Sequence, residues 1–183
     1  MNLHRRIVVP DLTALQEQVI KLIPAELYKS PRVFYPSDQS AFFEIPELVA
    51  LLNLHALRPA DTNFGFYVMS PFGRSVVHMD WGKSDYSMNI PLINCNNTFT
   101  SFYKSSKEPE LIPARTINGL KFTPHYSFNN ATFEEIDKFE SNTPCVMHIK
   151  TPHDVNNCQP TTRANLLIRC VDNSVMAALL NLL

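Results

Sequence analysis

The chain has 183 residues, and its hydrophobic content of 45% and aromatic content of 10% argue against a disordered protein and predict one domain with a real core. A formal net charge of −1 leaves no overall basic field for nucleic acid or an anionic membrane. The N-terminus lacks the apolar run of a signal peptide, and no stretch reaches transmembrane length, so we expect a cytoplasmic protein. Four cysteines without a C-x-x-C pair are typical of free thiols in a reducing compartment.

The N-terminal third has the pattern of helices that rest on an apolar surface. Residues 11–23 carry apolar side chains at helical spacing, and Asp11 is placed to cap the helix. Residues 28–35 contain a proline and several aromatics, which predicts an irregular or edge segment. A proline at the first helical turn opens a second helix over residues 46–54. We expect residues 1–61 to form a helical support for the rest of the domain.

From residue 62 the pattern changes to short β-type runs separated by turn residues. Strands are expected at residues 64–70, 74–78, 86–93, 98–103, 114–122, 145–150 and 163–171. A helix is expected near residues 133–139, and the apolar tail, 173–183, is expected to contain a short helix. The spacing of the strands over residues 62–172 predicts a sandwich or barrel, with jelly rolls and cupins among the options.

The segment R-S-V-V-H-M-D, residues 74–80, ends in two potential metal ligands. In a strand, alternate side chains share a face, so His78 and Asp80 would point the same way. An imidazole and a carboxylate form two thirds of a 2-His-1-carboxylate site, the ligand set of non-heme Fe(II) oxygenases. The second half of the chain offers three candidates for the third ligand: His125, His148 and His153.

These candidates differ in their surroundings. His125 lies in a proline-flanked loop, and His148 lies inside an apolar run, where a hydrogen-bonded core histidine is the simpler interpretation. His153 is followed ten residues later by Arg163, which enters an apolar strand. A buried arginine needs an anionic partner, and its planar fork suits a carboxylate. This pattern favours His153 and predicts a small carboxylate bound beside the metal.

The arginine itself leaves alternatives open. Arg169 shares a strand face with Arg163 and is a second candidate for the carboxylate anchor, although the spacing from His153 favours Arg163. Arg163 could also have a structural role by pairing with Asp172 or Glu135.

Taken together, H-M-D (78–80), N-I-P-L-I-N (89–94), P-H-D-V-N-N (152–157) and R-A-N (163–165) resemble the Fe(II)/2-oxoglutarate-dependent dioxygenases. The resemblance is to their small members, including the aspartyl/asparaginyl β-hydroxylase-like group and the short phage and bacterial hydroxylases. It covers about residues 62–171. It implies a double-stranded β-helix, which is a cupin-like jelly roll, with N-terminal helices packed on the sheet.

The resemblance also implies the site. His78, Asp80 and His153 would hold Fe(II), and Arg163 would bind the distal carboxylate of 2-oxoglutarate. Asn165 stands where the family often has serine or threonine. Asn89 is a further candidate for contact with 2-oxoglutarate or substrate, as are Ser87 and Tyr103. The implied reaction consumes 2-oxoglutarate and O2, with ascorbate a candidate reductant, and hydroxylates a small molecule such as an amino acid, or a peptide side chain.

Two other classes of protein compete with this interpretation. A cupin-like isomerase or a metal-binding module without redox chemistry would use the same barrel, but it has no need of Arg163. A capsid-type jelly roll would leave the whole set of His, Asp and Arg residues unexplained. The loops 104–113 and 123–131 are expected to frame the substrate entrance, with Trp81 as a wall or a rim residue and Arg74 as a candidate for binding an acidic group.

Overall fold

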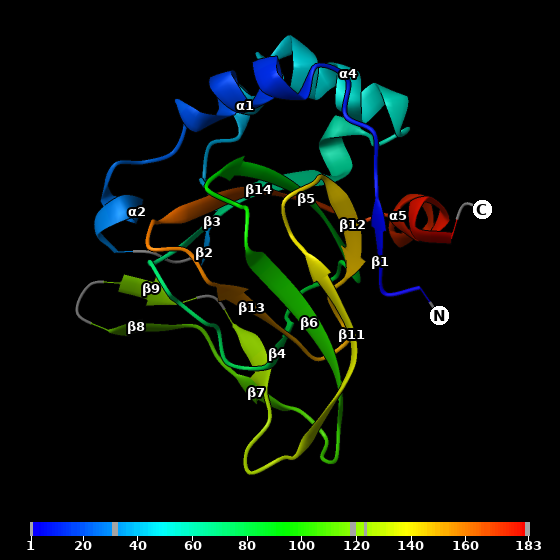
Figure 1. Ribbon diagram of the computed structural model, residues 1–183. Helices are drawn as coiled ribbons and strands as arrows, with labels where there is room; N and C mark the ends of the chain where they lie inside the picture. Colours follow the sequence, from blue (N-terminus) through cyan, green and yellow to red (C-terminus); the bar gives the residue numbers. More distant parts are fainter. Residues whose placement is uncertain (1, 31–32, 118–119, 123, 182–183) are drawn as a thin grey trace.

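The computed structural model describes residues 2–30, 33–117, 120–122 and 124–181, which form a mainly β protein with two antiparallel six-stranded sheets (Figure 1). Sheet A contains, in spatial order, β1 (His4–Arg6), β12 (Cys145–His148), β5 (Tyr86–Ile93), β14 (Arg163–Cys170), β3 (Thr62–Met69) and β2 (Val33–Phe34). Sheet B contains β11 (Phe133–Glu140), β6 (Thr98–Ser105), β13 (His153–Asn157), β4 (His78–Asp80), β10 (His125–Ser127) and β7 (Glu110–Ile112). A separate hairpin is made of β8 (Arg115–Ile117) and β9 (Leu120–Phe122).

The order of strand pairing defines the fold. Eight strands form four antiparallel pairs nested along the chain: β6 pairs with β11, β5 with β12, β4 with β13, and β3 with β14. Successive pairs alternate between sheet B and sheet A. This nested arrangement is a double-stranded β-helix, the jelly-roll architecture. The predicted fold class is therefore confirmed.

The helices cover one face of sheet A. They are α1 (Leu12–Ile20), α2 (Glu26–Lys29), α3 (Ser40–Phe43), α4 (Pro46–Leu54), a 3-10 turn (Pro59–Asp61) and α5 (Asn173–Asn181). Asp11 caps α1 as predicted, because its side chain accepts a hydrogen bond from the backbone N–H of Ala14 at 3.2 Å. Figure 1 shows α1 and α4 lying above β5 and β14. In the described part of the chain, no helix combines the length and the hydropathy needed to cross a membrane.

The main hydrophobic core lies between these helices and the outer face of sheet A, and not inside the barrel. Strand β14 shows why, since alternate side chains point to opposite faces. Ala164, Leu166 and Ile168 face the helices and belong to the core. The side chains that alternate with them face the barrel interior: Arg163, Asn165, Leu167 and Arg169. Folding is thus stabilised on one face of sheet A, which leaves the other face free to carry polar groups.

Truncation of a core leucine in α4 should show this division. Leu48 is completely buried beneath the helix layer, whereas Leu54, at the end of the same helix, is 56% exposed. We expect Leu48→Ala to lower the free energy of unfolding by about 2–5 kcal/mol, because it leaves a cavity. Leu54→Ala should change it by less than about 0.5 kcal/mol. Urea denaturation measures both; equal effects would place the core elsewhere.

The helix predicted near residues 133–139 is wrong, because this segment is strand β11, paired with β6. A β-bulge at Ile136 explains the misleading spacing of its aromatic residues. Phe133 lies opposite Ser105, and Phe139, beyond the bulge, lies opposite Thr100. The extra residue shifts the alternation, so an apolar residue at every third position fits a bulged strand as well as a helix.

Other boundaries also differ from those predicted. The strand predicted at 74–78 is wrong: β4 begins only at His78, and Arg74 forms an isolated bridge with Asn156. The run 114–122 forms the hairpin β8–β9, and its residues 118–119 lie outside the described chain. Residues 31–32, 123 and 182–183, on which further predictions fall, also lie outside it. Strand β13, which carries His153, was not predicted.

Candidate metal centre

Three side chains converge between strands β4 and β13. His78 and Asp80 alternate on β4 and therefore share its inner face, while His153, the first residue of β13, lies directly opposite His78. Each offers one ligand atom, and these atoms lie within 4.8 Å of one another. Side-chain rotation can close that separation to the roughly 3 Å between neighbouring ligand atoms of one ion. The structure thus brings together the three residues that the sequence proposed as ligands.

Backbone carbonyls hold both imidazoles in a single tautomer. Nδ1 of His78 donates a hydrogen bond to the carbonyl oxygen of Val76 at 2.8 Å, and Nδ1 of His153 donates to that of Thr151 at 2.9 Å. A carbonyl oxygen can only accept, so the proton of each neutral ring is on Nδ1. The lone pair of each Nε2 is then directed toward the other ligands. Metal-binding histidines are commonly oriented in this way.

The ionisation of two of the three ligands, Asp80 and His153, suits a cation. Burial lowers the pKa of His78, but the adjacent Asp80 carboxylate outweighs it and leaves this pKa above its usual value until a metal takes the place of the proton. Burial raises the pKa of Asp80, but the nearby Arg169 guanidinium and then His78 outweigh it, so that this pKa lies well below its usual range. Burial, and then the proximity of His78, lowers the pKa of His153 to about 4. At neutral pH the site therefore presents an anionic carboxylate and a neutral imidazole, which are the forms that bind metals.

Arg169 holds the carboxylate in place. Its Nη2 donates to Oδ2 of Asp80 at 2.5 Å, while Oδ1 of Asp80 lies 3.5 Å from Nε2 of His78. One carboxylate oxygen is thus engaged by the guanidinium, and the other faces the histidines. Because of this division, Asp80 is oriented to give a metal one oxygen.

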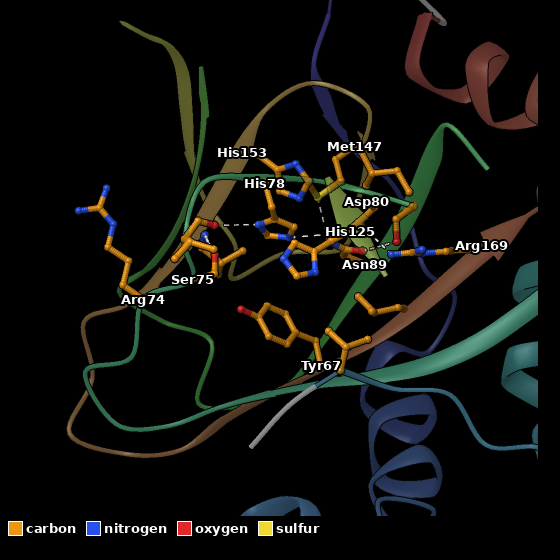
Figure 2. Close-up of a pocket in the computed structure, with 16 residues that line it drawn as sticks. Tyr67, Arg74, Ser75, His78, Asp80, Asn89, His125, Met147, His153 and Arg169 are labelled. Atoms are coloured by element: carbon orange, nitrogen blue, oxygen red, sulfur yellow. Dashed lines mark hydrogen bonds and ion pairs between the residues drawn. The ribbon is translucent and has the colours of Figure 1, made fainter. Parts of the chain in front are cut away.

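We expect Arg169→Met to weaken metal binding by about 10–100-fold, the usual effect of losing a group that orients a metal ligand. A cobalt(II) titration followed by absorbance measures the affinity. Arg74→Met is the control, because Arg74 points away from the site (Figure 2) and its Nε instead donates to Asp154 at 2.7 Å. Equal losses in the two variants would mean that the change acts through general stability.

A cavity of about 460 Å³, here called the metal cavity, opens around these ligands. Its walls are formed by the ligands and by side chains from both sheets: Val33, Tyr67, Arg74, Ser75, Val76, Ser87, Asn89, His125, Met147, Ile149, Val155, Leu167 and Arg169. Ser87 and Asn89 line it as anticipated, and they are joined by a hydrogen bond of 2.7 Å. The cavity is therefore polar at the metal site and largely apolar around it.

Other proposed residues lie elsewhere. Tyr103 does not line the metal cavity, and its hydroxyl accepts a hydrogen bond from Nη2 of Arg74 at 3.2 Å. His148 lies outside the ligand cluster, with Nδ1 2.8 Å from the hydroxyl of Thr151. Arg74 does line the metal cavity, but its Nε donates to Asp154 and its guanidinium points away from the ligands (Figure 2).

Arg163 is buried inside the barrel but is not one of the residues that line the metal cavity. It is 1% exposed, and within the described ranges its Nε and Nη1 have no hydrogen-bond partner. Its guanidinium carbon lies 5.6 Å from the centre of the Tyr67 ring, which does line the cavity. No ion pair of Arg163 with Asp172 or Glu135 is found among the described residues.

Asn165, the other proposed co-substrate residue, has a partner within the protein. Its amide oxygen accepts a hydrogen bond from Sγ of Cys95 at 2.9 Å, and its side chain is not part of the metal cavity wall. All four cysteines are free thiols, as expected, and only Cys158 is exposed.

Sequence reasoning missed two residues beside the ligands. His125 was set aside as a loop residue, but it lies on β10 directly opposite Asp80 and lines the metal cavity beneath His78 (Figure 2). Tyr67 carries no motif; burial raises its pKa to about 12, so its hydroxyl stays protonated. One signal for Tyr67 was available: Phe66 and Val68 are apolar core residues of β3, so the side chain between them points to the opposite face, into the barrel. None was available for His125, whose position depends on strand pairing.

No family model matches the chain, and no curated protein matches it. Among solved structures, it is similar to a Pseudomonas putida prolyl-4-hydroxylase, with 10% identity, a TM-score of 0.46, and coverage of 93% of this chain and 92% of that one. It is also similar to the non-heme monooxygenase ThoJ in complex with nickel, with 10% identity, a TM-score of 0.37, and coverage of 90% and 71%. A Burkholderia pseudomallei oxidoreductase of the 2OG-Fe(II) oxygenase family has 12% identity, a TM-score of 0.35, and coverage of 94% and 97%.

Proposed function

We propose that the protein is an Fe(II)- and 2-oxoglutarate-dependent oxygenase. It would oxidise, most simply by hydroxylation, an unactivated C–H bond of a small molecule such as an amino acid, or of a peptide side chain, with release of succinate and CO2. The observation that carries the proposal is the combination of a His-Asp-His cluster inside a jelly roll with a buried arginine, two of whose donors have no partner in the described part of the chain.

The donor set fits ferrous iron. His78, Asp80 and His153 would hold it on one side, and two imidazoles with one carboxylate favour non-heme Fe(II). The bound iron would supply the redox chemistry that activates O2 and oxidises the substrate. The protein's own contribution is to fix the ligands through the Val76 and Thr151 carbonyls and Arg169.

The orphaned donors of Arg163 fit the distal carboxylate of 2-oxoglutarate. Unpaired buried N–H groups cost about 1–3 kcal/mol each, and a bidentate carboxylate would satisfy both. The alternative anchor, Arg169, is already engaged by Asp80 at 2.5 Å. The two arginines are six residues apart on β14, which is roughly 20 Å along an extended strand.

The remaining wall of the metal cavity is largely apolar. Val33, Ile149, Val155 and Leu167 surround the ligands with apolar surface. An apolar wall strengthens the ionic contacts that hold the co-substrate and limits side reactions of a strong oxidant.

The test is succinate formation from 2-oxoglutarate by the purified protein with Fe(II), ascorbate and O2. We expect slow turnover without added substrate, and stimulation by the correct member of a panel of amino acids and peptides. His78→Ala should abolish both. A protein that binds iron firmly but neither binds nor consumes 2-oxoglutarate would instead be a cupin-like isomerase or a metal-binding module.

A further inference from the structure

A second cavity of about 350 Å³, here called the side cavity, adjoins the metal cavity. The two share Val33, Asp80 and Arg169. The side cavity lies at the end of β14 that carries Arg169, so it is on the opposite side of the ligand cluster from Arg163. If 2-oxoglutarate extends from the metal toward Arg163, the side cavity remains open for a second molecule.

Tyr35 and Arg169, which both line this cavity, each carry one buried donor without a hydrogen-bond partner among the described residues. Nε of Arg169 and the hydroxyl of Tyr35 are both inaccessible to water, and neither has a hydrogen-bond partner in the part of the chain that the structure describes. The guanidinium carbon of Arg169 lies 5.3 Å from the centre of the Tyr35 ring. Burial raises the pKa of Tyr35, so its hydroxyl keeps the proton that it can donate. A ligand with acceptor oxygens would satisfy both groups.

The backbone is shaped to admit the Tyr35 ring. A Cβ atom on Gly65 would lie 2.5 Å from Cε1 of Tyr35, which is shorter than a van der Waals contact and would be a steric clash. Glycine at this point of β3 therefore lets the ring lie against the inner face of sheet A. Tyr35 belongs to the N-terminal region, so the helical support also contributes to the wall of the cavity.

The charge around the side cavity is predominantly positive. Of its described lining residues, Lys83 and Arg169 are cationic and Asp80 is the sole acid. The ammonium of Lys150 donates to the backbone carbonyls of Asp80 and Gly82 at 2.8 and 2.9 Å, directly behind the wall. Once a metal binds Asp80, its negative charge is compensated, and the cavity favours an anion.

We propose that the side cavity binds the substrate that is oxidised, and that this substrate is an organic carboxylate. Its acid group meets Tyr35, Lys83 and Nε of Arg169, and its carbon body lies against apolar walls. These walls are formed by Val33, Trp81, Pro124 and Val171. Trp81, 47% exposed, forms the rim over which the body enters. This inference rests on the proposed function and names the substrate class of the same site.

The experiment uses the full chain loaded with cobalt(II) and saturating 2-oxoglutarate under nitrogen, so that binding is measured without turnover. Calorimetry compares a panel of aliphatic, aromatic and amino-acid carboxylates, each beside its primary amide. We expect at least one carboxylate to bind about tenfold more tightly than its amide, because an ionised acceptor forms stronger hydrogen bonds.

Two variants locate the binding. Tyr35→Phe removes only the hydroxyl, and Lys83→Met removes one charge; each should weaken carboxylate binding about fivefold or more and leave the affinities for cobalt and 2-oxoglutarate unchanged. Lys104→Met, at an exposed position on β6, is the matched control and should have no effect.

The outcomes separate this inference from the proposed function. Should cobalt and 2-oxoglutarate bind normally while no panel member binds, or while acids and amides bind alike, the substrate class is overturned and the oxygenase proposal stands. Carboxylate binding that is unaffected by both Tyr35→Phe and Lys83→Met overturns the location. Failure of 2-oxoglutarate to bind overturns the proposed function, and the inference with it.

Discussion

Asp80→Ala should lower the affinity for cobalt(II) or iron(II) by more than about 100-fold and abolish succinate formation. Loss of a group that merely orients a ligand already costs about 10–100-fold, and Asp80 is the only anionic member of the ligand cluster. The variant also leaves Arg169 without its carboxylate partner, so that an uncompensated cation would face the incoming metal. Competition with a chelator of known affinity measures the effect.

The control for this variant is His148→Ala. His148 is half-buried and packs against Tyr86 with ring centres 5.2 Å apart, outside the ligand cluster. Its removal should leave metal affinity within a few-fold of the unchanged protein. If Asp80→Ala and His148→Ala bound metal equally well, the cluster at His78, Asp80 and His153 would not be the metal site.

Arg163→Met should separate stability from function. The apparent KM for 2-oxoglutarate should rise by about 100-fold or more, because a buried partner of a carboxylate contributes about 2–5 kcal/mol. The metal-free protein should nevertheless become more stable by about 1–3 kcal/mol, since a side chain of similar size replaces a buried charge whose Nε and Nη1 are unpaired. Initial rates at varied 2-oxoglutarate and urea denaturation measure the two quantities.

Arg163→Lys provides the intermediate case, because it keeps the charge and loses the two-pronged geometry. We expect its KM to lie between those of the original protein and Arg163→Met. A loss of stability in Arg163→Met with unchanged dependence on 2-oxoglutarate would contradict the assignment. It would restore the alternative that Arg163 is a structural residue and would return Arg169 to consideration as the anchor.

Much of the candidate site was accessible from short-range pattern. The pair His78 and Asp80 could be recognised because alternation in a strand places residues two apart on one face, even though the strand was expected to begin earlier than it does. Arg163 could be singled out because a charge in a buried strand demands a partner. Both arguments use only neighbours in the chain, so they remain valid even where the predicted start or end of a strand is wrong.

The role of Arg169 was not accessible in this way. Before the fold was known, Arg163 and Arg169 were two candidates on one strand face for a single role. Pairing of β14 within sheet A, and the position of β4 in sheet B, bring Arg169 to Asp80. They leave Arg163 buried, with no hydrogen-bond partner for its Nε and Nη1 among the residues that the structure describes. The distinction comes from the register between strands, which no local pattern contains.

By itself, the sequence determined the mainly β character and the helices that precede and follow the barrel strands in the chain. It also determined four side chains with the chemistry of a metal and carboxylate site. The tertiary structure decided where the hydrophobic core lies, how His125 and Tyr35 reach the cavities, and which arginine orients Asp80. The physical reason is that burial and charge pairing depend on which strand faces span the barrel. Those contacts are made between residues far apart in the chain, and their energies cannot be assigned until the strands have paired.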